Sequence, residues 1–169
     1  QIQTINIDVI SATGAEADAS AALAAGQRET QAFQAAADAW RKTAEALSRV
    51  EDVAKAASPE TLRTVRWARS KALVRAGDIW TGASQLEEMI TELEQAGQGA
   101  SEMATRTREQ LATAYYYGAR LMRLSGEPPE EWLIESGKAR QQFRYLAEQA
   151  RAKGGSPQTV ENQRRNLEL

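Results

Sequence analysis

The segment around Gly77 constrains the fold most. Two stripes of apolar residues, spaced three or four apart, flank the dipeptide Gly77-Asp78. Each stripe predicts an amphipathic helix. Because the connection is only two residues long, the second helix must run back along the first. Gly77 can take the left-handed conformation that ends a helix, and Ser58-Pro59 is a typical helix start. The sequence therefore predicts an antiparallel helical hairpin between Ser58 and Gly97.

Similar signals predict a hairpin on either side. Downstream, Ser101 starts a helix that Gly126 ends, and a second helix follows. Upstream, an Ala-rich run over 15–25 and an amphipathic stripe over 27–57 are separated by Gly26, which predicts a turn. The expected helix starts near 16, 59 and 102 recur every 43 residues. We therefore expect three hairpins in tandem, because one hairpin cannot bury its apolar stripe alone.

The expected fold is all-α, with tandem antiparallel helical hairpins over 13–155 that form a right-handed, repeat-like stack or a helical bundle. Ala is frequent and aromatic residues make up 6% of the chain, which favours helices packed closely through small side chains. Residues 156–169 are expected to form a short polar C-terminal helix. We expect Trp40, Trp80 and Trp132 to be structural. The residues expected to be buried on the apolar stripes are Phe33, Trp40, Leu47, Leu73, Leu86, Ile90, Leu111, Tyr115, Phe143 and Leu146.

Residues 1–12 have a different pattern. Ile5, Ile7 and Val9 alternate with Asn6 and Asp8, which predicts an extended N-terminal arm. No second strand is expected to pair with its backbone. The arm could be disordered, lie along a hairpin of its own chain, or dock on a neighbouring chain. Its apolar residues are unusual for a disordered tail, so we favour docking.

Composition excludes several functions. The chain has no Cys and no His, so it lacks thiol nucleophiles, imidazole bases and the ligands that zinc prefers; we expect no catalysis, metal or cofactor. Lys and Arg number 21 against 23 Asp and Glu, a balance that does not favour nucleic acid. No apolar run is long enough for a membrane span. The chain starts at Gln1, which fits an exported chain after signal-peptide removal and equally a trimmed cytoplasmic protein; we favour export.

Small, large and turn residues recur at fixed offsets in the second and third hairpins. In the second hairpin they are Ser70, Leu73, Gly77, Ile79, Gly82, Leu86 and Met89. In the third they are Tyr115, Gly118, Ala119, Met122, Gly126, Ala139, Phe143 and Leu146. The pattern over 59–153 resembles the tetratricopeptide repeat. Arg66 and Arg69 stand where that family has apolar residues, the loop at Pro128-Pro129 is longer, and the spacing exceeds the usual 34.

Two sets of aromatic and cationic residues share corresponding helix faces. They are Trp67, Lys71 and Arg75 in the second hairpin, and Tyr116, Arg120 and Arg123 in the third. The resemblance implies that both sets line the concave surface of the stack, where an acidic or carboxylate-terminated peptide would bind. The alternative is a solvated basic face with Trp67 buried between hairpins.

Two functions fit these expectations. The first is a non-enzymatic scaffold that holds a peptide or a partner subunit on its stacked hairpins. The second is a structural subunit that assembles into a homo-oligomer or filament, with Ile5, Ile7 and Val9 of the arm docking on a neighbouring chain. A monomer in solution would favour the first, and a concentration-dependent series of sizes would favour the second.

Overall fold

The computed structural model describes residues 2–154, with side chains from residue 20 onward. Over this range it contains six α-helices and no strand, so the all-α class is confirmed. The helices are α1 (Ile2–Arg49), α2 (Glu51–Ala57), α3 (Pro59–Ala76), α4 (Ile79–Gln95), α5 (Glu102–Leu124) and α6 (Pro129–Ala152). The chain divides after residue 39 into two compact units. The C-terminal helix expected over 156–169 lies outside the described residues.

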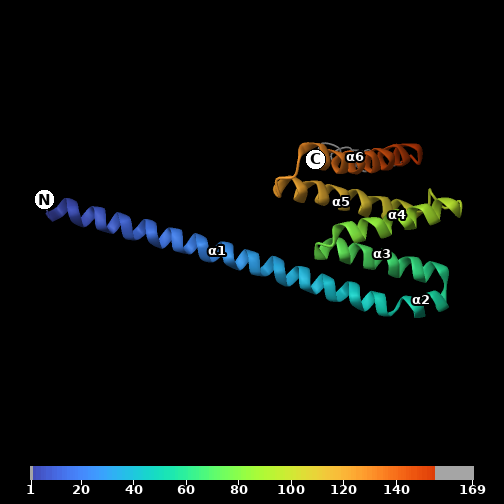
Figure 1. Ribbon diagram of the computed structural model, residues 1–169, viewed down its shortest axis with the longest axis horizontal. Helices are drawn as coiled ribbons and strands as arrows, with labels where there is room; N and C mark the ends of the chain where they lie inside the picture. Colours follow the sequence, from blue (N-terminus) through green and yellow to red (C-terminus); the bar gives the residue numbers. More distant parts are fainter. Residues whose placement is uncertain (1, 155–169) are drawn as a thin grey trace. The chain divides into compact units, whose positions relative to one another are not determined.

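The hairpin expected around Gly77 is formed by α3 and α4. Ser58 caps α3, and its hydroxyl oxygen accepts a hydrogen bond from the Thr61 N–H at 3.0 Å. Gly77 ends the helix with φ +93°, and the Asp78 N–H donates to the Leu73 carbonyl at 3.0 Å. This left-handed ending satisfies carbonyls that a helix C-terminus leaves free. Figure 1 shows α4 returning antiparallel to α3.

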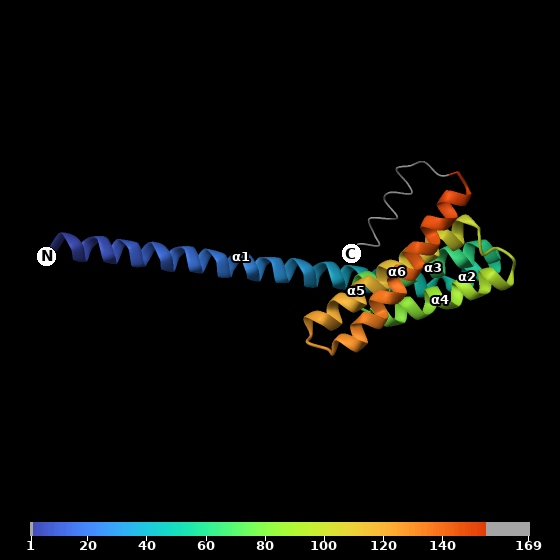
Figure 2. The same ribbon diagram turned by 90° about the horizontal axis from the view of Figure 1, so that it is seen from above.

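The downstream hairpin is formed by α5 and α6. The Ser101 hydroxyl accepts a hydrogen bond from the Ala104 N–H at 3.1 Å, and Gly126 has φ +80° after the end of α5. Pro129 then takes the first position of α6, where a proline costs no helical hydrogen bond. The turn between α5 and α6 lies at the same end of the helices as the α3–α4 turn, as Figures 1 and 2 show.

The main core lies where α4 of one hairpin packs against α5 of the next. Leu86 is fully buried, and Ile90, Leu111 and Tyr115 are almost so. The buried cluster around them also contains Val74, Ile79, Ala83, Ala114 and Ala139. Burial is therefore confirmed for Leu86, Ile90, Leu111, Tyr115, Phe143 and Leu146, whereas Leu47 and Leu73 are half-buried.

The structure accounts for two arginines that break the apolar pattern of α3. Arg66 bonds both carboxylate oxygens of Glu92 on α4, at 2.8 and 2.9 Å, and Arg69 pairs with Glu51 on α2 at 3.1 Å. Both pairs are partly exposed, so each contributes about 1 kcal/mol or less. At these two positions ion pairs, and not apolar side chains, connect α3 to α4 and to α2.

The expected first hairpin is not formed. Helix α1 continues through Gly26 without a turn, and Phe33 and Trp40 are 68% and 36% exposed instead of buried. Within residues 20–39 every side chain is exposed except Ala37, which is half-buried. A glycine in a helix interior costs only about 1 kcal/mol relative to alanine. This is too little to break an Ala-rich helix at Gly26.

The expected extended arm at the N-terminus is also not seen, because α1 begins at Ile2. Alternating apolar residues favour a strand only when a neighbouring strand accepts its hydrogen bonds, whereas a helix satisfies its backbone locally. The side chains of Ile5, Ile7 and Val9 lie outside the described residues, so docking of this segment on another chain stays a prediction.

The contact between α3 and α4 requires a glycine. A Cβ on Gly82 would lie 2.6 Å from Val74 Cγ2 and 2.8 Å from the Ser70 carbonyl oxygen. We expect Gly82→Ala to lower the free energy of unfolding by about 1–3 kcal/mol. Gly137→Ala is the matched control, because a Cβ there meets nothing within 4 Å and alanine favours the helix by about 1 kcal/mol. Urea denaturation followed by circular dichroism measures both changes, and equal shifts would contradict this packing.

Candidate partner-binding site

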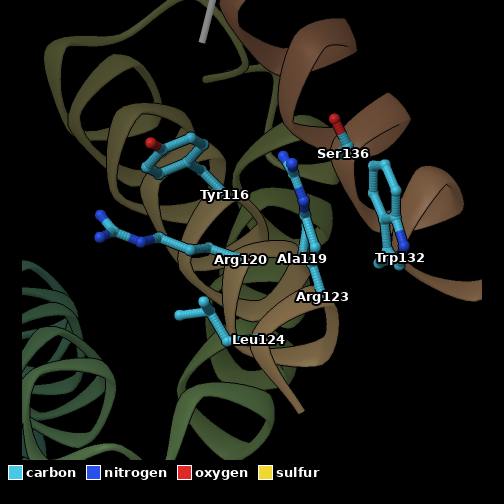
Figure 3. Close-up of a pocket in the computed structure, with 7 residues that line it drawn as sticks. All are labelled: Tyr116, Ala119, Arg120, Arg123, Leu124, Trp132 and Ser136. Atoms are coloured by element: carbon cyan, nitrogen blue, oxygen red, sulfur yellow. The ribbon is translucent and has the colours of Figure 1, made fainter. Parts of the chain in front are cut away.

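A pocket of about 300 Å³ lies between α5 and α6, close to the turn that joins them. Figure 3 shows its lining side chains. Five come from the last three turns of α5 and two from the start of α6: Tyr116, Ala119, Arg120, Arg123, Leu124, Trp132 and Ser136. The pocket thus depends on the α5–α6 turn, which brings residues from both helices together.

The helical repeat places these side chains on one face of each helix. Tyr116, Arg120 and Arg123 fall within about 60° around α5 at 100° per residue. Trp132 and Ser136 are four residues apart on α6 and share a face in the same way. In Figure 3, Arg123 extends between Tyr116 and Trp132, whereas Arg120 extends on the side of α5 away from α6. The pocket therefore has an aromatic side chain on each helix, and two arginines of α5 contribute to its lining.

The two arginines that line the pocket are positively charged. Arg120 and Arg123 are exposed, and neither forms an ion pair within the described residues. The Arg123 guanidinium lies 5.6 Å from the centre of the Trp132 ring, a cation–π arrangement that holds the arginine against the wall. A guanidinium stacked in this way keeps its N–H donors free for an anion. The pocket can therefore accept an anionic group next to an apolar or aromatic one.

The structure divides the six residues that the sequence predicted as one groove. Tyr116, Arg120 and Arg123 line the pocket, whereas none of the three on α3 does. Trp67 is half-buried and packs against the same core cluster as Tyr116. The Lys71 Nζ lies 5.2 Å from the centre of the Trp67 ring. Arg75 is exposed. The α3 set thus contains a packed tryptophan and its neighbouring cation rather than part of this pocket.

Sequence reasoning missed the contribution of α6. Trp132 was expected to be structural, yet it forms a wall of the pocket, and Ser136 received no role. The available signal was the turn at Gly126, because a helix that returns after a turn places its first residues beside the last residues of the helix before it. Trp132 is therefore close to Arg123 although they are nine residues apart in the sequence.

A second polar cluster lies away from the pocket, between α4, α5 and α6. The buried Tyr115 hydroxyl donates a hydrogen bond to Glu87. The Lys138 Nζ donates a hydrogen bond to the Glu135 carboxylate at 2.8 Å. It also lies 5.3 Å from the centre of the Tyr115 ring. Burial, and then the Glu87 carboxylate, raise the pKa of Tyr115 well above its ordinary value. The phenol is therefore protonated at neutral pH and serves to join three helices.

Among residues with described side chains, no three carboxylates lie close enough together to hold a metal ion. None of the helices in the described range has the length and apolar character needed to cross a membrane. Comparison of the chain with protein-family models, curated proteins and solved structures gives no match.

Proposed function

We propose that this protein is a non-enzymatic scaffold that binds a segment of another protein in the α5–α6 pocket. The observation that carries the proposal is a pair of exposed arginines, unpaired within the described residues, beside two aromatic walls. Arginine and aromatic residues are the side chains most enriched at the energetic centres of protein interfaces. The resemblance to the tetratricopeptide repeat over 59–153 supports the same function, because hairpin stacks of that kind bind peptides.

The chemistry of the pocket supports binding over catalysis. Its ionisable side chains are Tyr116, Arg120 and Arg123, and an arginine stays protonated and cannot act as a general base. Ser136 is the only serine in the lining. Its hydroxyl oxygen accepts a hydrogen bond from the Arg140 guanidinium at 3.3 Å. A serine needs a neighbouring base to become a nucleophile. The pocket provides donors and apolar surface, which are what recognition of a partner requires.

Site-specific photocrosslinking tests this function in the native cells. A photoreactive residue in place of Leu124, which is exposed and lines the pocket, should capture a specific partner. The same residue in place of Leu133, exposed on α6 outside the pocket lining, should not. The double variant Arg120→Glu, Arg123→Glu should abolish capture at Leu124 because it reverses both charges. Equal capture at both positions, or capture that survives charge reversal, would contradict the proposal.

A second candidate is self-assembly through α1. Leu23 and Phe33 are 67% and 68% exposed on this helix, and large apolar side chains on an amphipathic helix are usually covered. Light scattering over a range of concentrations should then show an oligomer for the full chain and a monomer after residues 1–39 are removed. A monomer for both chains, each at its own mass, would eliminate this candidate and leave the binding scaffold.

A further inference from the structure

Next to the cationic side of α5 lies a strip of exposed apolar side chains. Tyr117, Leu121 and Leu124 follow each other at spacings of four and three, so they share one face of the helix. Their exposed fractions are 37%, 49% and 72%. Trp80 of α4, which is 49% exposed, extends the strip toward the other hairpin. We call these four residues the apolar strip.

Trp80 occupies a fixed place because Gly118 leaves room for it. A Cβ on Gly118 would lie 2.6 Å from the Cη2 atom of the Trp80 ring, so the indole packs directly on the backbone of α5. A cavity of about 180 Å³ lies beside the ring and is lined also by Leu121, Met122 and Glu127. The apolar strip is therefore preformed, with a hollow in which an apolar side chain fits.

The apolar strip is continuous with the pocket. The rings of Tyr116 and Tyr117 lie 5.8 Å apart, centre to centre, and they belong to the pocket and to the strip respectively. Leu124 belongs to both. From Arg123 to Leu121 the combined surface covers about 160° of the circumference of α5. Trp132 of α6 borders one side of it and Trp80 of α4 the other.

We infer that this combined surface binds a short amphipathic segment of a partner protein, with apolar side chains on the apolar strip and acidic side chains on Arg120 and Arg123. The inference rests on the proposed scaffold function and specifies its partner. Charge sets the orientation, because the two arginines lie on the pocket side whereas Glu127 lines the cavity beside Trp80. A carboxylate is attracted to the first side and repelled from the second. The surface thus favours a segment with its acidic residues along one edge of its apolar face.

The test uses a phage-displayed library of random dodecapeptides, selected on the full chain. Selected peptides should combine Asp or Glu with large apolar residues, and their affinity is then measured by fluorescence anisotropy. The double variant Arg120→Gln, Arg123→Gln should weaken binding about tenfold or more, because charge-assisted hydrogen bonds are lost. Its matched control, Arg106→Gln with Arg144→Gln, removes two exposed charges outside the pocket lining on the same helices. The control should leave the affinity unchanged.

A second pair of variants, one test and one control, examines the apolar strip. Leu121→Ser should weaken binding about tenfold, and Leu133→Ser, at a comparably exposed leucine of α6, should not. Synthetic peptides with Gln and Asn in place of Glu and Asp should also bind about tenfold more weakly. Circular dichroism of each variant checks that its helices are kept. Because all substituted positions are exposed, folding is expected to survive.

The other possible outcomes of these experiments distinguish failure of the inference from failure of the scaffold function. If neither the full chain nor a chain that ends at Gly154 selects a peptide, both the inference and the scaffold function fail. If selected peptides are not acidic, or the arginine and Leu121 variants bind as well as wild type, the inference fails and the scaffold function stands on the photocrosslinking result. If light scattering shows a dimer that Leu121→Ser dissociates, the occupant is a second copy of the chain. If peptides bind only to a chain that ends at Gly154, the occupant is the chain's own C-terminal segment.

Discussion

The packing of α4 against α5 is the interaction on which the rest of the structure depends. It joins the two hairpins through the fully buried Leu86 and Met89 of α4 and Leu111 and Thr107 of α5. A leucine that is removed from water in this way contributes about 2 kcal/mol relative to an exposed one. Because α5 is held between α4 and α6, the exposed face near its end is held in place as well. That face carries the pocket and the apolar strip.

A buried arginine at the same interface has partners on two neighbouring helices, although its Nε has no hydrogen-bond partner within the described residues. The Arg108 side chain is 7% exposed and pairs with Glu94 of α4. Its guanidinium also lies 4.4 Å from the centre of the Tyr145 ring on α6. An unpaired buried charge would cost several kcal/mol, so these contacts allow an arginine to join three helices where an apolar residue would be expected. Tyr115, with Glu87 and Lys138, joins the same three helices elsewhere in the interface.

The features that sequence predicted correctly are those set by local chemistry. Ser58, Gly77, Ser101 and Gly126 act through hydrogen bonds and backbone conformations within a few residues of themselves, so both described hairpins could be located in advance. Phe33 shows the limit of this reasoning, because an apolar stripe indicates a helix and does not indicate whether another helix covers it. Three of the seven residues that line the pocket, namely Tyr116, Arg120 and Arg123, could be predicted for the same reason, because they share a face of α5 by helical spacing alone. The role of Trp132 depends on how the α5–α6 turn directs the returning helix.

Burial at the α4–α5 interface holds the two hairpins together and so keeps the face with the pocket and the apolar strip in place. Urea unfolding of Leu86→Ala, compared with Leu124→Ala, tests it most directly because the two leucines differ chiefly in burial, 0% against 72% exposed. We expect the free energy of unfolding to fall by about 2–5 kcal/mol for Leu86→Ala and to change by no more than about 0.5 kcal/mol for Leu124→Ala. A change within about 0.5 kcal/mol at Leu86 would show that the interface does not hold the hairpins together.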